Sequence, residues 1–281
     1  MGAIGGGIAP WAPTGVVGIE KAAEAGYTEN IATPLLINVV IASIFVSIAI
    51  YILYRGWRLK GGTGMDRREI PKFNKSQILT LIGIFVMVFC VIVFKTNIGL
   101  TSFLIAGMLI ILGVADMKEC VKAIPFNTML LVLGVGVLMN VVITAGGINL
   151  LAKGLSTIMT VFTAPALIAL ASGIMSWFSS TSGVVMPTMI PAIPTILGNL
   201  GTNAIPPALM VSAVTMGSSA AGISPASTGG GLIMSAIAGE ETGKKLDANK
   251  LFVKLFLTSV FTVGMAVLFA LIGGYNFTPY S

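Results

Sequence analysis

Long apolar runs recur along this chain, and they limit its possible folds more than any other feature. Each has about the 20 residues that a helix needs to cross roughly 30 Å of hydrocarbon. They lie near residues 31–54, 77–95, 98–115, 125–145 and 251–274. Only 9% of the residues are charged, against about 25% in a typical soluble domain. The sequence therefore predicts an all-α polytopic membrane protein.

The basic residues predict how the spans are oriented. Most of them gather in segments 55–76, 116–122 and 240–254, and alternating spans place these three segments on one side of the membrane. By the positive-inside rule that side is the cytoplasm. The charge of +6 flanks the spans and forms no basic patch with interleaved aromatic residues, so nucleic acid is not an expected partner. We expect a multi-pass protein, surrounded by lipid, in a bacterial-type inner membrane.

The residues needed for most enzyme mechanisms are missing or scattered. The chain has no histidine, which excludes a Ser-His-Asp triad and imidazole metal ligation within it. The two cysteines, Cys90 and Cys120, lie in different environments and have no metal-type spacing. We therefore expect no catalytic residues, no cofactor and no enzyme activity.

Region 157–198 predicts a re-entrant hairpin. The predicted orientation requires this region to enter the membrane and return on the same side. Its second limb, about 183–197, is short and contains Pro187, Pro191 and Pro194, which makes a full crossing unfavourable. The tip would be the polar stretch 178–183. Two ordinary short helices joined by a polar turn are the alternative.

Residues 1–10 and 216–225 resemble each other, with Met, two Gly, Ile and Pro at matching positions. A glycine-containing stretch, a charged loop and a long apolar span follow each copy. Because these spans run in opposite directions across the membrane, the two copies form an inverted repeat. Secondary transporters use inverted repeats with interrupted helices to place a binding site near the membrane midplane.

Glycines and a proline should interrupt the helix that contains the second copy, about 204–238. Each Gly costs about 1 kcal/mol and each Pro about 3 kcal/mol relative to Ala within a helix. Broken backbone at membrane depth needs protein or a water-filled cavity around it, so an interruption indicates a ligand site. Alternatively, the small residues only let helices pack closely.

Three segments, 179–187, 217–231 and 125–128 leading into the glycine-rich span 130–144, resemble the ion transporter superfamily of divalent anion/sodium symporters. The similarity is closest to its malonate and dicarboxylate carriers. The resemblance implies that a re-entrant hairpin faces an unwound helix in each repeat, with carboxylate and sodium bound between them. It also implies a homodimer.

The resemblance implies two sets of site residues. The anion would contact Ser179, Ser180, Thr181, Ser182, Thr14, Pro225, Ser227 and Thr228. Sodium, the coupling ion, would be held by Gly217, Ser218, Gly222, Ser224, Gly5, Gly6 and Gly7. One departure affects substrate preference, because Ser180 stands where the family has a central Asn.

A second departure concerns the first repeat, which is incomplete because its own hairpin would precede residue 1. We divide the chain into the end of the first repeat (1–54), a basic loop (55–76) and the second repeat with the C-terminal span (77–281). We expect an N-terminally truncated carrier or a half-protein that needs a partner chain.

Every carboxylate falls in a predicted loop, so no acid is available as a proton relay at membrane depth. This favours sodium coupling, or an exchanger without ion coupling. Without a cation at that depth, hydroxyls and backbone dipoles would hold the anion, which suits a carboxylate better than a phosphate. We predict secondary active transport of a C3 or C4 dicarboxylate, such as malonate or succinate, by alternating access. A non-transporting or partner-dependent subunit and an anion channel are the alternatives.

Overall fold

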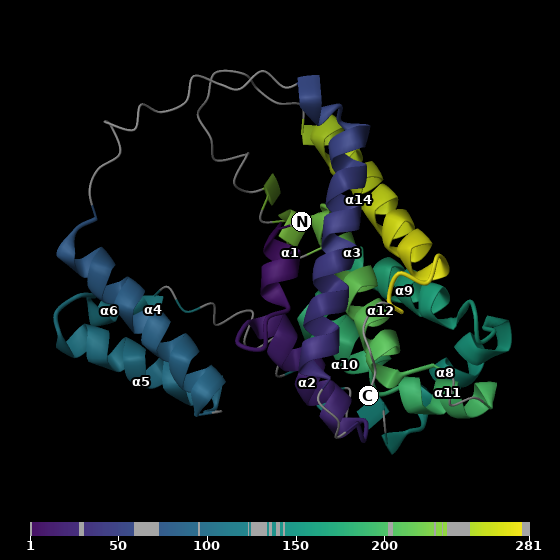
Figure 1. Ribbon diagram of the computed structural model, residues 1–281, viewed down its shortest axis with the longest axis horizontal. Coiled ribbons are helices and arrows are strands. Elements are labelled where there is room, and N and C mark those ends of the chain that lie inside the picture. The colour runs from purple at the N-terminus through teal and green to yellow at the C-terminus, as the bar shows by residue number, and fades with distance from the viewer. Residues whose placement is uncertain are drawn as a thin grey trace. The chain divides into compact units, whose positions relative to one another are not determined.

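The computed structural model shows a helical protein (Figure 1), and every regular element in the described residues is helical. It describes residues 2–27, 31–58, 73–94, 96–122, 124, 134, 137–138, 141–142, 144–201, 205–227, 229–231, 233–234 and 248–276. The chain divides into two compact units. One unit comprises Met1–Gly56 and Leu130–Ser281, and the other comprises Trp57–Met129.

The smaller unit contains α4 (Lys75–Val93), α5 (Ile98–Ile111) and the short α6 (Met117–Lys122). Asn74 begins α4 with a capping box, since its side chain accepts from the Gln77 N–H at 2.7 Å and the Gln77 side chain accepts from the Asn74 N–H at 2.9 Å. Helix α5 has 14 residues and is shorter than the predicted span 98–115. It ends early because Gly113, at φ +69°, takes the left-handed conformation that stops a helix.

The larger unit contains the long apolar helices α3 (Ala32–Leu53) and α14 (Ala248–Leu271). Together with the stretch Thr181–Leu200, they are the helical stretches in the described residues with the length and composition to cross a membrane. The prediction of an all-α polytopic membrane protein is therefore confirmed. The predicted span 125–145 lies mostly outside the described residues.

The core of the larger unit forms around α12 (Pro207–Ala220), which is buried on nearly all sides. It packs against α3, α14 and α9 (Ala164–Ser176), as Figure 1 shows. A Cβ atom on Gly217 would lie 2.2 Å from the carbonyl oxygen of Ala169, so only glycine allows α12 to approach α9 this closely. Buried polar contacts also join α12 to α3, where Asn38 donates to the Ser212 hydroxyl at 3.1 Å.

The second limb of the predicted hairpin is a series of short helices. A π-helical turn (Thr181–Val185) leads into α10 (Met186–Met189), and α11 (Ile193–Leu200) follows. Pro187 and Pro194 each lie in the first turn of a helix, where the missing N–H would have no helical partner. The helical path therefore has 20 residues, which is longer than the limb predicted from the sequence. The re-entrant course consequently stays a prediction.

Sequence reasoning missed α8 (Gly147–Ile158), which packs against α11. The side chain of Asn199 donates to the Ser156 hydroxyl at 3.1 Å and joins the two helices. The described residues also contain α1 (Gly2–Gly7), α2 (Pro13–Glu24), a 3-10 turn at Gly56–Arg58 and a second 3-10 turn, η3 (Ala221–Ile223).

Candidate functional site

The candidate site starts at the hairpin tip, where α9 ends and the chain reverses. Ser179 donates to the carbonyl of Met175 at 2.7 Å, and the Ser180 side chain accepts from the Gly183 N–H at 3.2 Å. The Val185 N–H bonds to the carbonyl of Ser180 at 3.1 Å, five residues back, which defines the π-helical turn. Such π-helical turns are frequent at functional sites.

Hydrogen bonds join this tip to the second repeat copy. Thr181 donates to the carbonyl of Ser218 at 3.1 Å, and its oxygen lies 3.1 Å from the Ser176 hydroxyl. Ser224 donates to the carbonyl of Trp177 at 2.9 Å. Ser218 and Ser224, which were predicted to hold sodium, thus lie against the tip that was predicted to bind the anion.

The second copy leaves helical geometry after α12, and its own surroundings satisfy the freed carbonyls. Thr262 on α14 donates to the carbonyl of Ala220 at 2.7 Å, and Ser259 donates to that of Ala221 at 3.0 Å. Ser227 contacts the carbonyl of Gly222 at 2.9 Å. We call residues 220–227, which begin with the last residue of α12, the second break. The carbonyls of Ala220, Ala221 and Gly222 thus each have a hydroxyl partner.

The first copy has an equivalent interruption between α1 and α2, and we call the corresponding residues 5–12 the first break. The alignment that pairs Met1 with Met216 also pairs their backbone hydrogen bonds. In the first copy, N–H groups donate from Ala9 to Gly6 at 3.2 Å, from Ala12 to Ala9 at 2.7 Å and from Val16 to Ala12 at 2.9 Å. In the second, they donate from Ser224 to Ala221 at 2.8 Å, from Ser227 to Ser224 at 2.9 Å and from Gly231 to Ser227 at 2.9 Å.

A glycine at matching positions closes both breaks. A Cβ atom on Gly15 would lie 2.3 Å from the carbonyl oxygen of Ile8, and one on Gly230 would lie 2.8 Å from that of the matching Ile223. The following carbonyls, of Ala9 and Ser224, would be closer still, at 2.2 and 1.9 Å. The two segments therefore share one local backbone structure, which the sequence identities alone only suggested. Their inverted orientation stays a prediction.

The side chains of the two breaks differ. Ser224 and Ser227 of the second break correspond to Ala9 and Ala12 of the first, which have no hydroxyl. The Ser227 oxygen accepts from the Gly230 N–H at 3.2 Å, whereas no side chain caps α2. The polar backbone of the first break thus lacks the support that serines give the second.

The first copy also lies near the hairpin. Helix α2 packs against the π-helical turn and α10, where a Cβ on Gly18 would lie 3.0 Å from Cε of Met186. Thr14 is half-buried in the first turn of α2. Gly5 belongs to α1, which packs against α3, and a Cβ there would lie 3.8 Å from the Ser43 hydroxyl. The hairpin thus contacts both copies, the second by hydrogen bonds and the first by packing.

The other predicted residues are distributed around these elements. Gly6 and Gly7 complete α1, Ser182 lies on the π-helical turn, and Pro225 is buried in the second break. The Ser218 hydroxyl donates within α12, to the carbonyl of Val214 at 2.7 Å. Thr228 lies outside the described residues.

Among the described residues, the site is polar and contains no carboxylate. Carboxylates in the described part of the chain are exposed and lie on α2 or around α6, and they are Glu20, Glu24, Asp116 and Glu119. Hydroxyls, carbonyls and N–H groups therefore supply the polar atoms around the tip and both breaks. Such groups can coordinate a cation through oxygen or hold a carboxylate through N–H and O–H donors.

Most of the chain matches a known protein family. The profile of the citrate transporter family (CitMHS) matches residues 1–217, which is most of the chain. The chain belongs to the citrate transporter family. This family consists of secondary transporters of citrate-like organic anions, so the prediction of a membrane transporter is confirmed. Comparison with curated proteins and with solved structures gives no match.

The citrate transporter match includes the first break and the hairpin. The closer relation to malonate and dicarboxylate carriers inferred from the sequence stays a prediction. Sequence reasoning missed Ser176, Ser259 and Thr262, which are the hydroxyl partners of this transporter's tip and second break. A polar residue on an apolar span was the available signal for the pair on α14, because such side chains usually hydrogen-bond another helix.

Proposed function

We propose that this transporter carries a citrate-like carboxylate anion in symport with sodium, and that the anion binds between the hairpin tip and the two breaks. The contact from Thr181 to Ser218 carries this proposal, because it joins the tip to the interrupted helix through a hydroxyl and a backbone carbonyl. Citrate, which the family description names, is the first substrate to test. Malonate and succinate, which the sequence favoured, come second.

The polar groups at the tip suit a carboxylate. Ser180, Thr181 and Ser182 are consecutive in the sequence. They lie at the start of the π-helical turn, whose hydrogen bonds differ from those of an α-helix. Hydroxyls and N–H groups are strong donors to carboxylate oxygen in a site that water does not fill. Recognition by neutral donors would let the anion leave again, as a carrier requires.

Sodium would bind at the first break. In the second break, Thr262, Ser259 and Ser227 already donate to backbone carbonyls. The first break has alanines in place of both serines, so the carbonyls near Gly5, Gly6 and Gly7 have more freedom to coordinate a cation. Backbone carbonyls of interrupted helices coordinate sodium in other transporter folds.

Alternating access would move the hairpin relative to the rest of the protein. Helix α3 belongs to the same compact unit as the hairpin, whereas α4 and α5 belong to the other unit. Bonds such as Asn38 to Ser212 would have to break if the hairpin and α12 moved against α3. We therefore propose that α3 moves with the hairpin.

Uptake into proteoliposomes tests the proposal. The full chain, reconstituted with an inward sodium gradient, should accumulate radiolabelled citrate, malonate or succinate, and an equal potassium gradient should not support uptake. Saturable uptake without sodium would contradict the proposed coupling of anion transport to sodium. Current without saturation would indicate a channel, and no uptake unless another membrane protein is added would indicate a partner-dependent subunit.

Thr181→Val tests the site itself. The substitution keeps the shape of the side chain and removes the hydroxyl that contacts Ser218, so we expect at least a ten-fold loss of initial uptake rate, from a hydrogen bond worth about 1.5 kcal/mol or more. Thr195→Val, on α11 of the same limb, is the matched control and should keep near-normal uptake. Equal rates in the two variants would exclude the tip from the site.

A further inference from the structure

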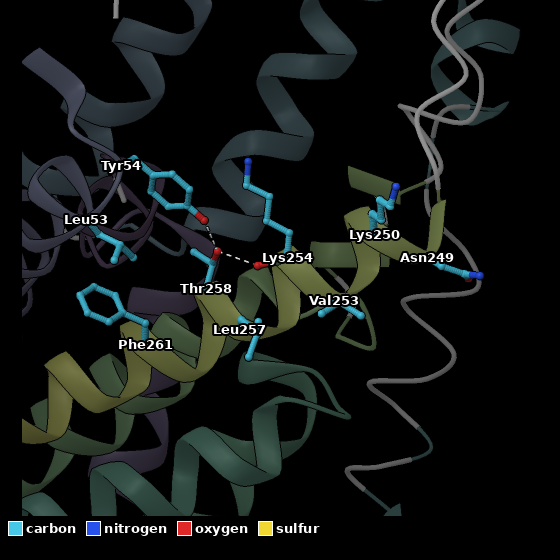
Figure 2. Close-up of a pocket in the computed structure, with 9 residues that line it drawn as sticks. All are labelled: Leu53, Tyr54, Asn249, Lys250, Val253, Lys254, Leu257, Thr258 and Phe261. Atoms are coloured by element: carbon cyan, nitrogen blue, oxygen red, sulfur yellow. Dashed lines mark hydrogen bonds between the residues drawn. The ribbon is translucent and has the colours of Figure 1, made fainter. Parts of the chain in front are cut away.

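A pocket lies away from the hairpin tip, between the C-terminal end of α3 and the first turns of α14. Its volume is about 750 Å³, within the usual range for small-molecule sites. Figure 2 shows its lining, which consists of Leu53, Tyr54, Asn249, Lys250, Val253, Lys254, Leu257, Thr258 and Phe261. Both helices have the length and composition to cross a membrane, so the pocket lies near a boundary between lipid and water.

A cation and an aromatic ring form the polar end of this pocket. The Lys254 ammonium lies 5.3 Å from the centre of the Tyr54 ring, which holds the lysine chain by a cation–π contact. The Tyr54 hydroxyl hydrogen-bonds Thr258, whose own hydroxyl donates to the carbonyl of Lys254 at 2.7 Å. Within the described part of the chain, no carboxylate lies within ion-pair distance of Lys254.

Charge and position together favour an anionic occupant. Figure 2 shows the side chains of Lys250 and Lys254 extending to the same side of α14, one helical turn apart. The segment that contains them is basic, and the positive-inside rule places it on the cytoplasmic side. Basic pockets between helices on that side of a membrane bind the head groups of anionic lipids.

The rest of the pocket is apolar and open, which distinguishes a lipid from a small anion. Val253 and Leu257 are 55% and 61% exposed, and Leu53 and Phe261 line the same pocket. A citrate-like anion would gain nothing from these side chains. An acyl chain would bury them, with a gain of roughly 25 cal/mol for each Å² removed from water.

We propose that this pocket binds an anionic phospholipid, with the phosphate at Lys254 and Tyr54 and an acyl chain along Val253 and Leu257. The lipid would bridge the ends of α3 and α14. This inference depends on the membrane location of the chain and not on the proposed transport site, so each can fail while the other holds.

Native mass spectrometry of the full chain in neutral detergent tests the lipid site. The protein is titrated with phosphatidylglycerol and, separately, with phosphatidylcholine of the same acyl chains. We expect tighter binding of phosphatidylglycerol, and about a five-fold loss of that affinity in Lys254→Gln, as expected for one lysine near an anionic lipid. Lys153→Gln on α8 removes the same charge elsewhere and should bind as the wild type does.

A second variant tests the apolar part. Leu257→Trp should fill the pocket and weaken phosphatidylglycerol binding, whereas Leu150→Trp on exposed α8 should not. Unchanged affinity in Lys254→Gln or Leu257→Trp would overturn the proposal, as would displacement of the lipid by inorganic phosphate. A dimer that binds no lipid would instead place a second copy of the chain in the pocket.

Discussion

The first and second breaks have matching backbone hydrogen bonds and a matching glycine contact, but they differ in how they satisfy the polar groups that an interruption exposes. In the second break, Ser224 and Ser227 bond to the tip and to the local backbone, and α14 adds two further hydroxyls. In the first break, Ala9 and Ala12 offer no such bonds. Backbone shape and ligand availability are therefore separate properties of a broken helix.

The largest effect should come from the glycines that close the breaks. Gly15→Ala and Gly230→Ala each place a methyl group against backbone carbonyls, so we expect each to lower the free energy of unfolding by about 3 kcal/mol or to prevent folding. Unfolding in SDS, followed by circular dichroism, measures this. Gly7→Ala and Gly222→Ala are matched controls at equivalent positions with open space and should cost little. A loss in only one copy would show that the breaks are packed differently.

Ser227→Ala should have the next largest effect, because it makes the second break resemble the first. It removes the acceptor for the Gly230 N–H and a donor to the carbonyl of Gly222. We expect a loss of about 1–2 kcal/mol in the same SDS assay. Ser76→Ala, in the exposed first turn of α4, is the control. An unchanged stability would mean that water replaces the serine and that the second break is as open as the first.

Thr262→Val should cost somewhat less, about 1 kcal/mol, because it leaves one carbonyl of the second break, that of Ala220, without its hydroxyl donor. If the freed carbonyl can coordinate sodium, the variant should also show a changed sodium dependence of uptake. Ser47→Ala is the control, since that hydroxyl bonds only within α3, to the carbonyl of Ser43. Equal losses of stability in the two variants would mean that the second break gains no special support from α14.

The reverse exchange, Ala12→Ser, should give the smallest change in stability and the most informative change in function. A serine there can cap α2 as Ser227 caps the next helical segment, which should raise stability by about 0.5–1 kcal/mol. The same hydroxyl would compete with sodium at the first break, so the sodium concentration for half-maximal uptake should rise. A gain in stability with unchanged sodium dependence would move the ion site away from the first break.

The sequence predicted the interruptions because they depend on residue type. Glycine and Pro225 disfavour a continuous helix wherever they lie, and the matching Met, Gly, Ile and Pro positions related the two copies. The apolar runs similarly predicted α3, α4 and α14 within a few residues. Helix interruptions and apolar spans depend on residues that are close in the sequence, so the sequence alone predicts them.

Other features depended on contacts that no local pattern contains. Ser259 and Thr262 meet the carbonyls of residues about forty positions earlier, and only the packing of α14 against η3 brings them together. Helix α8 was missed because its exposed, partly polar face resembles that of a loop. The length of the second limb was underestimated because Pro187 and Pro194 can start short helices as readily as they stop a long one.

The π-helical turn at Thr181–Val185 holds an extra residue compared with an α-helical turn. One residue of a helix corresponds to about 100° of rotation and 1.5 Å of rise, so this turn sets the phase of the whole limb that follows. With a regular turn in its place, the face formed by Met186, Met189 and Ile193 would rotate out of the core in which all three are now buried. This angular offset keeps the hydroxyls at the tip while the apolar face stays in the core.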